Sequence, residues 1–155
     1  MRTAEEILRE AETIAVVGAS PDPARPSYGV MAYLLRSGYR VLPVNPGAGG
    51  ELLGQRCFGS LAEIEEPVDL VDVFRKASLL PDVARDAVLV GAKTFWAQLG
   101  LFSQEAADIA HRAGLAVVMN RCLKIEHARF AGGLHLAGFD TGVISARRPR
   151  RPGAL

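Results

Sequence analysis

The stretch TIAVVGAS, residues 13–20, decides the fold of this chain. A short apolar run that is rich in β-branched residues and stops at a glycine predicts a buried parallel strand followed by a tight turn. Where a helix follows such a turn, unpaired backbone N–H groups are available to a phosphate. The stretch therefore predicts a nucleotide-binding site, with the amides of Gly18 and Ala19 and the hydroxyl of Ser20 at the turn.

The residues after this strand do not match the fingerprint of NAD-dependent dehydrogenases. That fingerprint has further glycines two and five positions after the first, whereas this chain has Ser20 and Pro23 there, and its next glycine is Gly29. Dehydrogenases also place a carboxylate after the second strand to bind the ribose, and this chain has Asn45-Pro46 at that point. The pattern disfavours an NAD(P)-dependent oxidoreductase, which we keep as the alternative function.

Length and charge exclude several classes of protein. The 155 residues fit one domain, and a formal net charge of +1 with both signs spread along the chain indicates no broad surface for nucleic acid or membrane. Without a secretory leader or an apolar run of about eighteen residues, we expect a cytoplasmic protein. Cys57 and Cys122 stand apart, so the sequence predicts neither a disulfide framework nor a metal site.

Apolar strand patterns alternate with helical patterns along the chain. We expect strands at 13–18, 40–44, 68–74, 92–96 and 115–119, and helices at 3–11, 28–37, 60–64, 79–90 and 103–113. Such alternation predicts the α/β class: one Rossmann-like, doubly wound domain with a five-stranded parallel sheet, strand order 3-2-1-4-5, and helices on both faces. The expected domain covers residues 1–131. Residues 132–155 form a basic C-terminal extension that we expect to be partly disordered, with a small RNA-binding arm as the alternative.

Polar, aromatic and glycine residues follow the ends of the expected strands, where open parallel sheets bind ligands. The residues at the five strand ends are Gly18, Ala19 and Ser20; Asn45 and Pro46; Phe74 and Arg75; Trp96 and Gln98; and Asn120. Ser27 adds a hydroxyl, and Arg25 or Arg75 adds a positively charged guanidinium group that can donate two parallel hydrogen bonds, so we expect a pyrophosphate here. The flat faces of Phe74 and Trp96 are expected to line an adenine or an apolar arm.

Six motifs occur together in a recognisable order. They are Ala15–Pro21, Arg25–Gly29, Pro43–Pro46, Val68–Arg75, Trp96–Gly100 and Met119–His127. As a set they resemble the stand-alone CoA-binding domain family, which is similar to the N-terminal CoA-binding domain of the succinyl-CoA synthetase α-subunit. The resemblance implies a Rossmann-like fold that holds coenzyme A or acyl-CoA, with the nucleotide near the Gly18 loop, Ser27-Tyr28 and Asn45-Pro46, and the remainder passing Phe74-Arg75 and Trp96.

The chain departs from the synthetase subunit in two respects. The synthetase has a lysine in a Pro-Gly-Lys-Gly-Gly turn, where this chain has Ala48. The phosphorylated histidine of the synthetase belongs to a following domain, and we expect no such domain here. The resemblance therefore implies ligand binding without ligase chemistry.

The residues themselves complete no catalytic constellation. The spacing between Cys122 and His127 is not a recognised catalytic spacing, so no residue is assigned a catalytic role. For Cys122 we favour a small, packed thiol, and the alternative is a thiol that faces the CoA sulfur and forms a mixed disulfide under oxidation. The function expected from the sequence is non-catalytic binding of CoA or acyl-CoA, with no protein partner identified.

Overall fold

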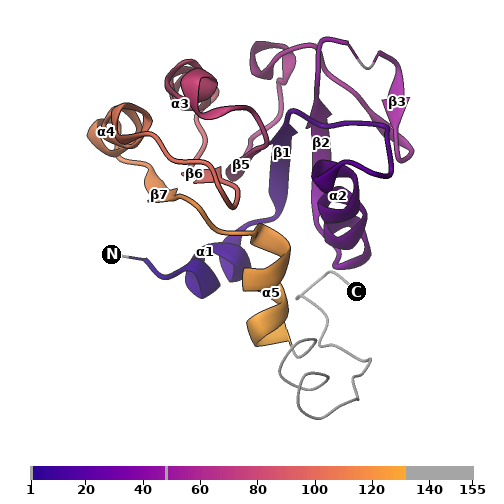
Figure 1. Cartoon of the computed structure of the whole chain (residues 1–155), viewed down its shortest axis with the longest axis horizontal. Helices are drawn as coiled ribbons and strands as arrows, with labels where there is room; N and C mark the ends of the chain where they lie inside the picture. Colours follow the sequence, from indigo (N-terminus) through magenta and orange to yellow (C-terminus); the bar gives the residue numbers. More distant parts are fainter. Residues whose placement is uncertain (1, 48, 132–155) are drawn as a thin grey trace.

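A computed structural model describes residues 2–47 and 49–131 as a three-layer α/β domain (Figure 1). The sheet is parallel throughout and contains β1 (Thr13–Val17), β2 (Arg40–Val44), β5 (Leu70–Val73), β6 (Thr94–Ala97) and β7 (Ala116–Val118). The helices are α1 (Ala4–Glu10), α2 (Pro26–Arg36), α3 (Leu80–Leu89), α4 (Gln104–Arg112) and α5 (Leu123–Ala131), with short 3-10 turns at Leu61–Glu63 and Ala77–Leu79.

Helices cover both faces of the sheet because successive strand residues point to opposite sides. Ala15 and Val17 of β1 pack in one apolar cluster with residues of α3 and α4, whereas Ile14 and Val16 pack in another with residues of α1, α2 and α5. Figure 1 shows the two groups of helices on opposite sides of the strands. Burial on both faces explains the nearly continuous apolar strands, and the α/β, doubly wound fold class is confirmed.

The position of one strand differs from the predicted order. The observed order is β2-β1-β5-β6-β7, so the third long strand pairs with β1 rather than with β2. In order of sequence this is 2-1-3-4-5, not 3-2-1-4-5, and it leaves β2 at the edge of the sheet. Pro43 explains the edge position, because a proline has no N–H to donate to a second neighbour.

Local signals in the sequence fix several element ends. Thr3 forms a capping box with Glu6 at the start of α1, and the Ser103 hydroxyl caps α4. Ser60 lies at the N-terminus of a 3-10 turn but makes no capping hydrogen bond. A two-stranded hairpin of β3 (Glu51–Leu52) and β4 (Gln55–Arg56) was not predicted. The basic extension, residues 132–155, lies outside the described residues.

Among the helices of the described part of the chain, none has both the length and the apolar character needed to span a bilayer.

Candidate ligand-binding site

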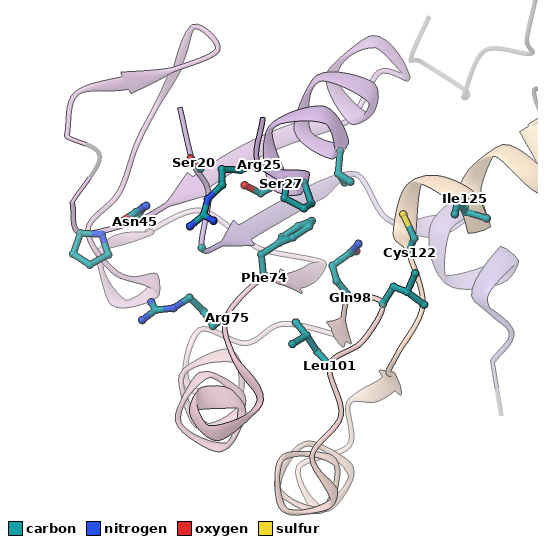
Figure 2. A pocket seen from close by; sticks show the side chains of 15 residues that line it. Ser20, Arg25, Ser27, Asn45, Phe74, Arg75, Gln98, Leu101, Cys122 and Ile125 are labelled. Carbon is teal, nitrogen blue, oxygen red and sulfur yellow. The ribbon is translucent and has the colours of Figure 1, made fainter. Parts of the chain in front are cut away.

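A cavity of about 690 Å³ opens beyond the carboxyl ends of the strands (Figure 2). This volume is in the range of small-molecule binding sites. Nine residues predicted from the strand ends and the following loop line it: Gly18, Ser20, Arg25, Ser27, Asn45, Pro46, Phe74, Arg75 and Gln98. Six further residues complete the lining: Pro26, Val30, Leu99, Leu101, Cys122 and Ile125. The structure thus brings most of the predicted residues to one cavity.

The two ends of the cavity differ in chemistry. Figure 2 shows Ser20, Arg25 and Arg75 at one end, which we call the basic end. Leu101, Cys122 and Ile125 lie at the opposite end, beside Gln98, and we call these four residues the thiol end. The ring of Phe74 lies between the two ends. The cavity therefore suits an elongated ligand that is anionic at one end and apolar at the other.

The basic end carries positive charge without a protein counter-ion. Arg25 is exposed and Arg75 is half-buried, and no ion pair is found for either guanidinium within residues 2–47 and 49–131. The described lining of the cavity also contains no aspartate or glutamate. Two unpaired guanidinium groups with no nearby carboxylate favour an anionic ligand, and arginine can donate two parallel hydrogen bonds to a phosphate.

The first turn of α2 adds a second positive element. Arg25 is its N-cap residue and Pro26 follows in the first turn, yet no side chain caps the helix. A helix terminus without a cap has unsatisfied N–H groups and a partial positive charge. Because Arg25, Pro26 and Ser27 all line the cavity, this terminus faces the same space as the two arginines. Helix N-termini of this kind bind phosphate.

The amides of the Gly18 turn are engaged within the sheet, and this corrects the sequence-based expectation. The N–H groups of Gly18 and Ala19 both donate to the Val44 carbonyl oxygen, at 3.0 and 3.3 Å. Ala19 is also fully buried and does not line the cavity. The parallel pairing of β1 with β2 continues into the turn, so these two amides are not available to a phosphate. At the start of α2, Pro26 has no N–H and the Tyr28 amide donates to the Arg25 carbonyl, so the Ser27 amide is the one left for that role among the described residues.

Asn45 holds the turn after β2 in place. Its Nδ2 donates to the Ala19 carbonyl at 2.5 Å, and its Oδ1 accepts from the Gly47 amide at 2.8 Å. Both polar ends of the side chain are therefore used within the protein. Asn45 lines the cavity, and its main contribution is to position the neighbouring loops.

Gln98 is a buried side chain that is only half satisfied. It is 6% exposed, and its Oε1 accepts a hydrogen bond from the Leu123 amide at 3.1 Å. Its Nε2 has no hydrogen-bond partner among the described residues, and Figure 2 shows the carboxamide directed into the cavity. Nε2 is not among the buried polar atoms that lack a partner, so it is reachable from the cavity. Gln98 Nε2 is thus available to donate a hydrogen bond to a group inside the cavity.

Besides Ala19, three predicted residues lie outside the cavity lining. Trp96 is fully buried, and its indole N–H donates to the Arg121 carbonyl at 2.9 Å, so it belongs to the core and not to the site. Tyr28 is half-buried and packs against the α1, α2 and α5 cluster. Asn120 has a φ of 62° and its Oδ1 accepts from the Gly100 amide at 2.7 Å, which is a structural role.

Titratable groups outside the cavity form no metal site within the described residues, where no cluster of three or more His, Cys, Asp and Glu side chains occurs. His127 is buried, and its Nδ1 lies 2.7 Å from the Tyr33 hydroxyl. It packs with the aromatic rings of Tyr39 and Phe130 and does not line the cavity with Cys122.

Comparisons with known proteins agree on the family. The sequence profile of the family described as CoA binding domain matches residues 12–128. The uncharacterized protein YneT of Bacillus subtilis (strain 168) is 42% identical over 124 residues, which are 80% of this chain and 91% of that protein. The solved structure of a hypothetical protein from Pyrococcus horikoshii OT3 is 42% identical, with a TM-score of 0.80, and the match covers 84% of this chain and 94% of that chain.

A larger enzyme shares the same domain. The apo structure of the dinucleotide forming acetyl-coenzyme A synthetase 1 of Ca. Korarchaeum cryptofilum is 28% identical, with a TM-score of 0.65, and the match covers 74% of this chain but only 27% of that chain. The similarity to the synthetase is therefore confined to one part of it. Together, the profile match over most of the chain and the likeness to YneT over 91% of that protein show that this chain belongs to the CoA binding domain family.

Proposed function

We propose that this protein binds coenzyme A or acyl-CoA and does not itself catalyse a reaction. The diphosphate lies at the basic end of the cavity, against Arg25, Arg75 and the first turn of α2. The pantetheine arm passes Phe74 toward the thiol end. The family match supports the identity of the ligand, and the distribution of charge in the cavity supports its orientation.

The observation that carries this proposal is the pair of unpaired arginines beside an uncapped helix terminus, at one end of an otherwise largely apolar cavity. CoA has a matching division, because its phosphates lie at one end and its sulfur at the other. A nicotinamide dinucleotide fits the cavity less well, since the Asn45-Pro46 turn supplies no carboxylate for its ribose.

The side chains at the site support a non-catalytic role. The described lining offers arginine, serine, asparagine and glutamine as polar groups, but no histidine or carboxylate that would act as a general base. The synthetase relative is a much larger chain, and the matched segment covers 27% of it. Two half-buried free thiols suit a reducing compartment, so we place this binding function in the cytoplasm.

Isothermal titration calorimetry of the full chain with CoA, in the presence of a reductant, tests the proposal. We expect saturable binding that weakens about tenfold or more in Arg75→Ala, because a hydrogen-bonded charge at the phosphate is lost. Arg36→Ala is the matched control, since Arg36 is an exposed arginine at the other end of α2. Binding should also weaken for 4′-phosphopantetheine, which lacks the 3′-phosphoadenylyl group and therefore one phosphate of the diphosphate. A flat titration at millimolar CoA would overturn the proposal.

A further inference from the structure

The thiol end of the cavity contains a cysteine whose backbone is held firmly. Cys122 directly precedes α5, and its carbonyl oxygen accepts the hydrogen bond of the Glu126 amide at 3.0 Å. The side chain is half-buried and lines the cavity, on the opposite side from Arg25 and Arg75 (Figure 2). Cys122 is therefore accessible from inside the cavity.

The unpaired Nε2 of Gln98 indicates that a ligand group belongs beside this cysteine. Gln98 is 6% exposed, lines the same end of the cavity, and directs an N–H₂ donor into it. Its Oε1 is bonded to Leu123, the residue next to Cys122, so the carboxamide and the thiol are held by the same turn. A ligand oxygen that satisfies Nε2, such as an amide carbonyl, brings the adjoining part of the ligand next to Cys122.

The second cysteine provides an internal comparison. Cys57 is also a half-buried free thiol, but it does not line the cavity. Its sulfur lies 3.8 Å from the Asn45 carbonyl oxygen, and burial raises the pKa of the Cys57 thiol. A reagent recognised by the cavity should therefore favour Cys122 over Cys57 more strongly than an unrecognised reagent does, because the raised pKa of Cys57 already slows its reaction with any disulfide.

We infer that Cys122 is a site of covalent attachment for coenzyme A, formed by thiol–disulfide exchange with the disulfide form of the ligand. The inference rests on the proposed function, because it requires the cavity to bind CoA with its sulfur at the thiol end. The Cys122 sulfur attacks one sulfur of CoA disulfide, a new bond joins Cys122 to one CoA, and the S–S bond of the reagent breaks. The second CoA leaves as a thiol with the proton from Cys122. Cys122 is oxidised and the departing CoA is reduced, so no further oxidant is needed.

Covalent attachment would make retention of the ligand depend on redox conditions. Under reducing conditions CoA binds reversibly, and after exposure to CoA disulfide it is held until a reductant cleaves the bond. The protein would then store CoA and shield one of its own thiols from further oxidation.

Intact-protein mass spectrometry of the full chain treated with CoA disulfide tests the inference. We expect wild type and Cys57→Ser to gain one CoA moiety, located at Cys122 by peptide mapping and released by reductant. Cys122→Ser should not gain it. The exchange with CoA disulfide should be at least about tenfold faster than with glutathione disulfide at the same concentration, because the cavity positions the reacting sulfurs. Arg75→Ala should reduce this preference.

The outcomes separate the inference from the function on which it rests. If calorimetry shows CoA binding, any one of three results would overturn the covalent site and leave the binding function intact. These results are that no adduct forms, that Cys57 and Cys122 are labelled equally, or that CoA disulfide reacts no faster than glutathione disulfide. A flat calorimetric titration would overturn both.

Discussion

Gly18 and Phe74 lie so close together that a Cβ atom on Gly18 would come within 2.8 Å of the Phe74 carbonyl oxygen. The Cβ would also come within 3.0 Å of Cδ of Arg75. The contact forms because the ladder between β1 and β5 continues past the strands, where the Phe74 amide donates to the Val17 carbonyl at 2.8 Å. A glycine at this point lets the loop that carries Phe74 and Arg75 lie against the end of β1, and so fixes one wall of the cavity.

We predict that Gly18→Ala lowers the free energy of unfolding by more than the backbone conformation alone explains. Gly18 has a φ of 90°, which costs a residue with a Cβ about 1–2 kcal/mol, and the contact with the Phe74 backbone adds to this cost. Gly91→Ala is the matched control, because Gly91 has a φ of 81° and nothing lies within 4 Å of its added Cβ. Chemical denaturation of both variants measures the difference. Equal losses would show that the close approach is unimportant.

Gln98→Glu should weaken CoA binding and leave the fold in place. The variant keeps an oxygen for the Leu123 amide, but it replaces the cavity-facing N–H₂ donor with a carboxylate oxygen. We expect affinity to fall by about tenfold or more, because a donor to a ligand carbonyl is lost and a negative charge is introduced. Calorimetry measures the affinity and circular dichroism checks the fold. Unchanged affinity would show that Gln98 does not contact the ligand.

Asp72 should make the protein less stable as pH rises. It is fully buried in β5, its carboxylate oxygens have no hydrogen-bond partner among the described residues, and burial raises the pKa of Asp72 well above its ordinary value of 3.8. The folded state therefore keeps a proton that the unfolded chain releases. This contribution is fully present below the unfolded pKa and is lost as pH rises through the folded pKa, at no more than about 1.4 kcal/mol per pH unit.

Asp72→Asn should remove this contribution, so the variant gains stability relative to wild type as pH increases. Asp69→Asn tests a pH dependence of stability with the opposite sign. Although burial, the largest single influence, acts to raise the pKa of Asp69, hydrogen bonds from the Thr13 and Glu12 amides and the nearby Lys93 charge outweigh it and lower the pKa. The stability that Asp69 contributes is therefore lost as pH falls. Urea unfolding from pH 2 to 9 measures both differences, because the Asp69 contribution is lost only below its ordinary pKa of 3.8. A flat difference between wild type and Asp72→Asn would contradict the assignment.

We propose that residues 1–131 form the complete binding domain, and that the basic extension is not needed for CoA. The family profile ends at residue 128, which supports this boundary. A chain that stops after Ala131 should bind CoA with the affinity of the full chain in calorimetry. Retention of the full chain, but not of a chain without residues 146–155, on immobilised RNA would favour the alternative, a basic arm. A large loss of CoA affinity on truncation would refute the proposed boundary.

The sequence predicts the fold class well because each strand is apolar on both faces and is followed by polar, glycine or proline residues that mark its end. The strand order was harder to predict from the sequence. Pro43 in the second strand indicated an edge position, but this signal competes with the general tendency of consecutive strands to be neighbours. The hairpin of β3 and β4 escaped prediction because its strands contain two residues each, too few to show a periodic pattern.

The binding site could likewise be predicted from the sequence only in part. Residues directly beyond strand ends, such as Arg75 and Gln98, are found from sequence because parallel strands end at one edge. Trp96 was misplaced because β6 extends to Ala97, which puts the indole within the sheet and Gln98 at the cavity. Ile125 was missed because it reaches the cavity through the packing of α5 over the sheet, and such tertiary placement leaves no local signal.

A crystal structure of the full chain with CoA tests the central claim most directly. We predict that the diphosphate lies within hydrogen-bonding distance of the Arg75 guanidinium and the first turn of α2, with the CoA sulfur beside Cys122. A complex in which CoA binds elsewhere, or in which its phosphates lie at the thiol end and leave Arg25 and Arg75 in solvent, would contradict it.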